Sequence, residues 1–188
     1  MESFCAFLRG INVNGRNMNM RDVCGIFQKA GMENVSSVLS TGNILFKSDI
    51  PAAELRGQLE QAISLHYSCG VSMFIKNTAE VKAMPDSSPF APDPVLHIYA
   101  FISEPGFEKI LAEEFAKITP VPQEAATVQN GLFYWQVPKG STLDAGFSKT
   151  LGRKDMKDKF TSRNLNTIQK ICDKMVAENP QRFFEGEG

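Results

Sequence analysis

The chain has 188 residues, of which 43% are hydrophobic and 22% are charged, with 20 Lys and Arg residues against 21 Asp and Glu residues. This composition excludes a disordered chain, a collagen-like repeat and a membrane-spanning protein. A chain of this length buries roughly 70% of its unfolded surface, which is enough for one large core or two small ones. The near-neutral charge also argues against a protein coated in basic residues for nonspecific nucleic-acid binding.

The cysteines and histidines give no sign of a metal centre. None of the four cysteines belongs to a Cys-x-x-Cys pair, and the two histidines lie far apart in the sequence. We therefore expect no metal site, no cofactor and a cytoplasmic protein with reduced thiols. The apolar run at residues 4–8 is too short for a signal peptide, so we also expect no membrane partner.

The first elements are a strand, a loop and a helix. Residues 3–9 form a short apolar run typical of a strand covered on both faces. A loop follows over residues 10–19. Asn19 and Asp22 are typical of a helix start, and apolar residues at helical spacing predict a helix over about residues 20–30, which Gly31 ends.

A hairpin, a second helix and a fourth strand complete the first half. Strand-like runs at residues 35–40 and 44–47 flank Ser40-Thr41-Gly42-Asn43, a turn sequence. Pro51 opens a helix that Gly70 ends, and residues 71–76 read as a strand. The order β-α-β-β-α-β is that of the ferredoxin-like split unit.

The second half repeats much of this order. We predict a ferredoxin-like half over residues 1–77, a Pro-rich connector over residues 78–94 and a second α+β half over residues 95–188. In that half a strand at 96–102, a helix after Pro105 and a hairpin around Asn130-Gly131 precede a helix over about residues 163–177. The predicted fold class is α+β, with duplicated ferredoxin-like (β-α-β-β-α-β) halves and mainly antiparallel sheets.

Four motifs carry a resemblance to a known family. They are Leu8-Arg9-Gly10-Ile11-Asn12-Val13, Gly15-Arg16-Asn17, Ser40-Thr41-Gly42-Asn43-Ile44, and Thr161-Ser162-Arg163-Asn164 with Thr167. In order and spacing they resemble the bacterial domain-of-unknown-function family sixteen-ninety-seven, over nearly the whole chain. The resemblance implies duplicated ferredoxin-like α+β halves and implies no activity. Asn14 and Arg16 stand where the family more often has Gly and Lys.

The Gly-rich first loop is the first candidate site. Its glycine spacing is that of a P-loop, but Arg16 and Asn17 stand where Lys and Ser or Thr would hold phosphate and magnesium, so we do not expect a nucleoside triphosphatase. A looser anion site stays open. The alternative is a crossover loop that glycines shape and asparagines brace. The candidate ligand-binding residues here are Arg9, Gly10, Asn12, Gly15, Arg16 and Asn17.

The hairpin sequence Ser40-Thr41-Gly42-Asn43 is also open to two interpretations. It could carry a ligand, but turn chemistry accounts for every residue in it. We expect this hairpin and the first loop at opposite ends of their sheet. On that expectation they share a pocket only across the duplication or a dimer.

The most polarised segment is the second candidate site. Residues 139–174 hold nine Lys and Arg residues against four Asp residues. Thr161 or Ser162 is expected to cap the last helix, whose N-terminus favours an anion, with Lys149, Arg163 and Asn164 as candidate contacts. The alternative is a solvated basic face interleaved with its own aspartates.

No residue pattern identifies a catalytic group, because no serine is placed with a histidine and no carboxylates are paired at a defined spacing. The aromatic strand at residues 132–135 is expected to be core rather than a base-stacking surface. The leading hypothesis is non-catalytic binding of a phosphate-bearing small molecule, nucleotide or nucleic acid. The alternatives are an enzyme acting on a small phosphorylated or carboxylate metabolite, and a protein-interaction module or homodimer. The two binding hypotheses predict that Arg9 and Arg163 lie close in space, and the interaction module predicts that they do not.

Overall fold

The computed structural model describes residues 1–13, 16–143, 145–156 and 158–178, with Val13 and Arg16 described by their backbone alone. Its contacts divide the chain into two units. One holds Met1–Lys82 and Gln169–Gly188, and the other holds Ala83–Ile168. Helices α3 (Thr78–Asp86) and α6 (Leu165–Ala177) each cross from one unit into the other, so the end of α6 groups with the first unit.

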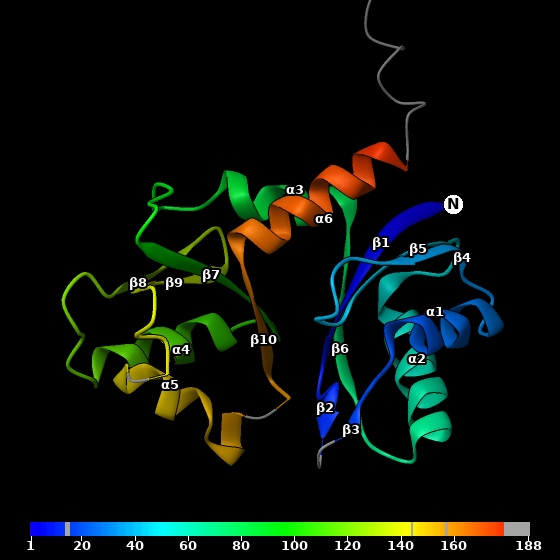
Figure 1. Cartoon of the computed structure of the whole chain (residues 1–188), viewed down its shortest axis with the longest axis horizontal. Coiled ribbons are helices and arrows are strands. Elements are labelled where there is room, and N and C mark those ends of the chain that lie inside the picture. Colours follow the sequence, from blue (N-terminus) through cyan, green and yellow to red (C-terminus); the bar gives the residue numbers. More distant parts are fainter. Residues whose placement is uncertain (14–15, 144, 157, 179–188) are drawn as a thin grey trace, which may run out of the picture. The chain divides into compact units, whose positions relative to one another are not determined.

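The first unit is built on a four-stranded antiparallel sheet in the order β4-β5-β1-β6 (Figure 1). Its elements are β1 (Glu2–Arg9), β2 (Asn12–Val13), β3 (Arg16–Asn17), α1 (Met20–Lys29), β4 (Glu33–Ser37), β5 (Asn43–Ser48), α2 (Ala52–Tyr67) and β6 (Ser72–Asn77). Apart from the small β2-β3 ribbon, the strand order is that of a ferredoxin-like unit, which confirms the predicted fold of this half.

Helices α1 and α2 cover one face of this sheet. Val23 and Phe27 on α1 are fully buried, and the Phe27 ring meets that of Phe46 on β5 edge-on at 5.4 Å. Asn19 caps α1, because its side chain accepts a hydrogen bond from the Arg21 backbone N–H at 2.9 Å. The apolar residues whose helical spacing predicted α1 are therefore the residues that α1 buries in the core.

The C-terminal part of α6 packs against the edge of the same sheet. The Lys174 ammonium donates to the Ser37 carbonyl at 3.0 Å, and the Ser36 hydroxyl donates to the Glu178 carboxylate at 2.9 Å. The Cys172 thiol donates to the Val81 carbonyl at 3.8 Å, so the end of α6 also contacts the start of α3. These contacts explain why residues after 168 belong to the first unit.

The second unit repeats the topology. Its antiparallel sheet has the order β10-β7-β9-β8, which matches the first sheet strand for strand. The elements are β7 (Leu96–Ser103), α4 (Phe107–Ala116), β8 (Ala125–Gln129), β9 (Leu132–Pro138), α5 (Gly146–Leu151), a 3-10 turn (Lys154–Met156) and β10 (Phe160–Asn164). The predicted duplication of ferredoxin-like α+β halves is confirmed.

One element of this unit corrects the sequence interpretation. We expected a helix from about Arg163 with Thr161 or Ser162 as its cap, but residues 160–164 form β10, which pairs with β7. The cap is Asn164, whose side-chain oxygen accepts from the Asn166 backbone N–H at 2.9 Å. Residues that favour caps also form strands, and here burial of Phe160 and Thr161 in the sheet decides the outcome.

Aromatic side chains fill the second core. The expectation that residues 132–135 are core is confirmed, since Phe133, Tyr134 and Trp135 are all buried. The Trp135 indole N–H donates to the buried Glu124 carboxylate at 2.9 Å, and the other oxygen of Glu124 accepts from the Val121 backbone N–H at 2.8 Å. Both oxygens of this buried carboxylate therefore have donors, as burial requires.

The buried Tyr134 hydroxyl makes the folded state less stable at alkaline pH. The hydroxyl donates to the Met84 carbonyl at 2.8 Å, and burial raises the pKa of Tyr134 to about 12 from 10.0. The unfolded chain releases this proton first, so stability holds below about pH 10 and falls as the pH rises towards 12. We expect Tyr134→Phe to flatten this fall in denaturant unfolding at pH 9 and pH 11.5, and an unchanged slope would contradict the assignment.

Two further observations concern the chain as a whole. Across the described residues, no helix is both long and apolar enough to cross a bilayer. All four cysteines are free; Cys5 and Cys172 are buried, and Cys24 and Cys69 are half-buried.

Candidate functional site

The first loop and the Ser40–Asn43 hairpin lie at the same end of the first sheet, which corrects the expectation that they lie at opposite ends. The Leu8 backbone N–H donates to the Gly42 carbonyl at 2.8 Å. The reason is chain direction, because α1, β4 and β5 each reverse the chain after β1. The start of β5 therefore returns to the end of β1, with which it pairs at Phe7 and Asn43.

Gly42 is the point of closest approach between these two segments. Its φ is +76°, and a Cβ placed there would lie 3.1 Å from the Leu8 Cβ and 3.2 Å from the Ile11 Cγ2. Only glycine combines that backbone conformation with that contact without strain. We name the surface formed by residues 9–12, 17 and 40–42 the loop end.

The first loop places polar side chains at the loop end. Gly10 has a φ of +82°, and the chain then folds back as the β2-β3 ribbon, in which Asn12 pairs with Asn17. Both asparagine side chains are exposed, and Arg9, the last residue of β1, is half-buried. Of the other candidates in this loop, Gly15 lies outside the described residues and Arg16 is described by its backbone only.

The hairpin contributes two exposed hydroxyl groups, from Ser40 and Thr41. Asn43 has a structural role, because its buried amide donates to the Val38 carbonyl at 3.0 Å and to the Thr41 hydroxyl at 2.9 Å. Turn chemistry thus accounts for Gly42, Asn43 and the Thr41 hydroxyl, while Ser40 and Thr41 stay exposed at this end of the sheet.

Tyr67 lies behind the loop end and was not singled out from the sequence. Its hydroxyl is buried, and no atom of a described residue lies in hydrogen-bonding geometry with it. The Asn19 backbone and the Asp22 carboxylate lie nearby. Burial first, and the Asp22 charge second, raise the pKa of Tyr67, so it stays a neutral donor at physiological pH. The missed signal was its position at the C-terminus of α2, which returns to this end of the sheet.

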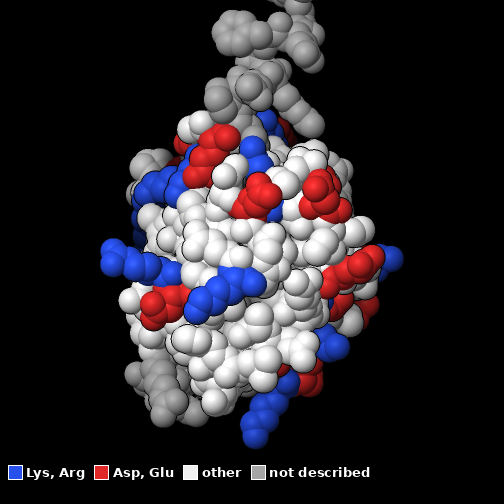
Figure 2. All heavy atoms as spheres, turned by 90° about the vertical axis from the view of Figure 1, so that its right-hand side faces the viewer, with Lys and Arg blue, Asp and Glu red and all other residues white. Residues whose placement is uncertain are grey.

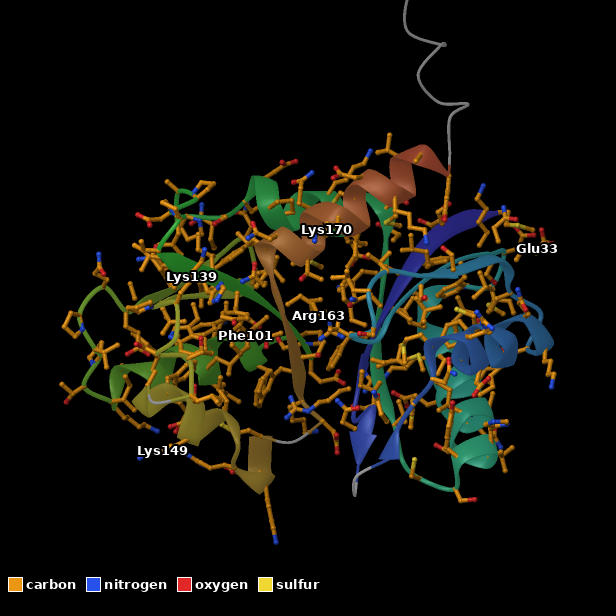
Figure 3. All side chains as sticks on the ribbon, in the orientation of Figure 1. Glu33, Phe101, Lys139, Lys149, Arg163 and Lys170 are labelled. Carbon is orange, nitrogen blue, oxygen red and sulfur yellow. The ribbon has the colours of Figure 1, made fainter. Side chains whose placement is uncertain are left out.

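The basic candidates of the second unit are not gathered at one point. Lys149 is exposed on α5, whereas Arg163 is half-buried on β10, and Figure 3 shows the two well apart. Arg163 donates to the Thr161 hydroxyl at 2.7 Å and to the Ser162 carbonyl at 2.9 Å. The Asn164 amide lies 2.9 Å from His97 Nδ1 while its oxygen caps α6. Arg163 and Asn164 therefore have intramolecular roles.

Acidic neighbours offset part of the basic charge. Arg153 forms ion pairs with Asp155 at 2.5 Å and with Glu114 at 2.6 Å, and Lys117 lies 2.6 Å from Glu114. These ion pairs favour a solvated mixed surface over a continuous basic track in the second unit. On the face turned to the viewer in Figure 2, which is the right-hand side of Figure 1 and carries the first unit, described basic and acidic side chains are also interspersed.

The part of the chain that the structure describes contains no group of three or more His, Cys, Asp or Glu side chains placed to hold a metal ion. The described side chains of the loop end offer amide and hydroxyl hydrogen bonds and the Arg9 guanidinium group. Such a set can bind an oxyanion, and it supplies no group with the acid-base properties of a catalyst at neutral pH.

Comparisons with known proteins give a family match and a structural neighbour. The family model described as "Protein of unknown function (DUF1697)" matches residues 1–134. The conserved bacterial protein SP0830 from Streptococcus pneumoniae has a similar structure, with a TM-score of 0.76, 23% sequence identity and coverage of 93% of this chain and 98% of that chain. This likeness shows a shared fold. No curated protein matches the chain.

Proposed function

Since the chain belongs to this family of proteins of unknown function, whose description gives no activity, we propose from the site itself that the loop end binds a phosphate-bearing ligand without catalysis. The ligand is a nucleotide, another phosphorylated small molecule or a nucleic acid. Arg9 supplies the charge. Asn12, Asn17 and the hydroxyls of Ser40 and Thr41 supply neutral hydrogen bonds.

One observation carries the proposal, namely the contact between two motifs that are far apart in the sequence. The Leu8-to-Gly42 hydrogen bond of 2.8 Å joins them at one end of the sheet. The Thr41 hydroxyl accepts from the Asn43 amide at 2.9 Å within the turn, whereas the exposed Ser40 side chain has no part in the hydrogen bonds that the Asn43 amide donates. The Leu8-to-Gly42 bond brings the hairpin to the end of β1, where Arg9 and the first loop follow, and this supports the proposal that their donors serve one oxyanion.

The second unit has a lesser part in this proposal. Lys149 is exposed and available for a phosphate contact. Arg163 and Asn164 already bond within their own unit, to Thr161 and Ser162 and to His97. We therefore place the proposed anion contact at the loop end of the first unit, and Lys149 is a separate candidate in the second unit.

The charge of Arg9 provides the test. We expect Arg9→Gln to weaken phosphate-ligand binding by about 1.5–3 kcal/mol, or roughly 10- to 150-fold, because a charge-assisted hydrogen bond is lost. The measurement is a thermal-shift series with inorganic phosphate, nucleoside phosphates, phosphorylated sugars and short single-stranded oligonucleotides at two salt concentrations.

Arg21→Gln is the matched control, because Arg21 is an exposed arginine on α1 outside the loop end. It removes the same charge and should leave ligand-induced shifts unchanged. If both variants lost the ligand-induced shift equally, the effect would come from net charge and not from a contact at the loop end. A shift in the wild type that Arg9→Gln leaves intact would overturn the assignment of the site.

We also propose a cytoplasmic location. The support is that the four cysteines are all free, which is typical of proteins in a reducing compartment.

A further inference from the structure

The second sheet has an open edge at β8. This strand is the last in the order β10-β7-β9-β8, and its register with β9 is regular from Ala125 to Gln129. The two-residue loop makes Gln129 and Leu132 a hydrogen-bonded pair, so by alternation Ala126 and Val128 direct their backbone N–H and C=O groups away from β9. Among the described residues, nothing bonds to these outward groups.

The edges of the first sheet, in contrast, are blocked. On β6 the Met73 backbone N–H donates to the Glu60 carboxylate at 2.8 Å. On β4 the register shifts between Glu33 and Ser36, and the Ser37 carbonyl accepts from Lys174 at 3.0 Å. Bulges and charged side chains at an edge are the usual means by which proteins prevent strand addition.

No such protection is present on β8. Its sequence, Ala-Ala-Thr-Val-Gln, contains no charge and no proline, and its pairing contains no bulge. Ala126 and Val128 pack on the core side of the sheet, whereas Thr127 points to the other side and is exposed. The edge is therefore regular and uncharged over its five residues, which favours an added strand.

We propose that this edge binds the β8 strand of a second copy of the chain, antiparallel and about a two-fold axis at Thr127. In that register Thr127 lies opposite Thr127 of the second copy, and Ala126 lies opposite Val128. The outward groups of these residues then form four backbone hydrogen bonds, two from each copy. The pairing is self-complementary, places no like charges together and sets two threonines side by side, which is a favourable cross-strand pair.

A cysteine placed at the two-fold axis tests the register. In Thr127→Cys the two sulfurs lie on directly opposed residues, so oxidised glutathione should convert most of the protein to a covalent dimer on a non-reducing gel. In the matched variant Gln129→Cys, the two new cysteines stand four residues out of register, at roughly 13 Å, and should stay uncrosslinked. Wild type gives the background from the four native thiols. Equal crosslinking of both variants, or none of Thr127→Cys, would overturn the proposal.

Loss of the outward donors tests the pairing itself. Ala126→Pro removes an N–H that β9 does not use, so the fold is retained while two of the four intermolecular hydrogen bonds are lost. Sedimentation equilibrium should give twice the chain mass of 20.8 kDa for wild type and the single mass for Ala126→Pro at the same concentration. A monomeric wild type, with or without an extended peptide bound at this edge, would contradict the proposal. The outcome is independent of ligand binding at the loop end.

Discussion

Gly42→Ala is expected to lower the free energy of unfolding by about 2–4 kcal/mol, through strain at a positive φ together with overpacking against a neighbouring strand. The added Cβ would lie 3.1 Å from the Leu8 Cβ and 3.3 Å from the Leu8 carbonyl oxygen. The second contact is with backbone, which cannot rotate away. The loss should appear in denaturant unfolding, and any ligand binding at the loop end should weaken with it.

Gly31→Ala is the control in the same unit. Gly31 has a φ of +90°, yet no atom lies within 4 Å of its added Cβ. It therefore carries the conformational penalty alone, about 1–2 kcal/mol. The difference between the two variants measures the contact between the hairpin and β1. Equal losses would mean that the two segments are not held together as described.

Trp135→Phe is expected to cost about 2–4 kcal/mol in the second unit, because it removes the indole N–H from the buried Glu124 carboxylate and leaves space beside Phe147. Glu124 is 7% exposed and receives that N–H at 2.9 Å, and the Trp135 and Phe147 rings meet edge-on at 5.5 Å. Trp135 is the one tryptophan of the chain, so unfolding is followed by circular dichroism.

A double-mutant cycle with Glu124→Ala separates the hydrogen bond from the packing. If the carboxylate and the indole interact as the geometry indicates, the double variant should lose less stability than the sum of the two single losses, by about 1–2 kcal/mol. Strict additivity would show that the bond contributes nothing and that the cost of Trp135→Phe is packing alone.

Much of the fold was readable because local signals agreed with one another. The apolar run at residues 96–102 became β7, the Asn130-Gly131 turn joined β8 to β9 at the expected residues, and Asn19 capped α1. These signals depend on a few neighbouring residues. Their order along the chain was sufficient to predict two ferredoxin-like halves.

The errors concern features that depend on tertiary contacts. Phe160 and Thr161 form a strand because β7 is available to pair with them, a fact that no local window contains. The sequence does not single out Tyr67, because its hydroxyl is buried only by the contact between the end of α2 and the start of α1.

The placement of the two loops of the first unit was wrong for a simpler reason. The direction of each successive element puts the hairpin beside the first loop, and this could have been worked out from the element order alone. The correction bears on the proposed site, because the Leu8-to-Gly42 hydrogen bond holds the hairpin against the end of β1.

The most direct test of ligand binding at the loop end is an NMR titration of isotope-labelled protein that follows the amide chemical shifts. The ligands are inorganic phosphate, a nucleoside monophosphate and a short single-stranded oligonucleotide. The account predicts saturable shifts at Gly10, Asn12, Asn17 and Thr41 with at least one of these ligands, and no saturable shift at exposed Lys149 of the second unit. Saturable shifts confined to the second unit, or none with any phosphate-bearing ligand, would contradict it.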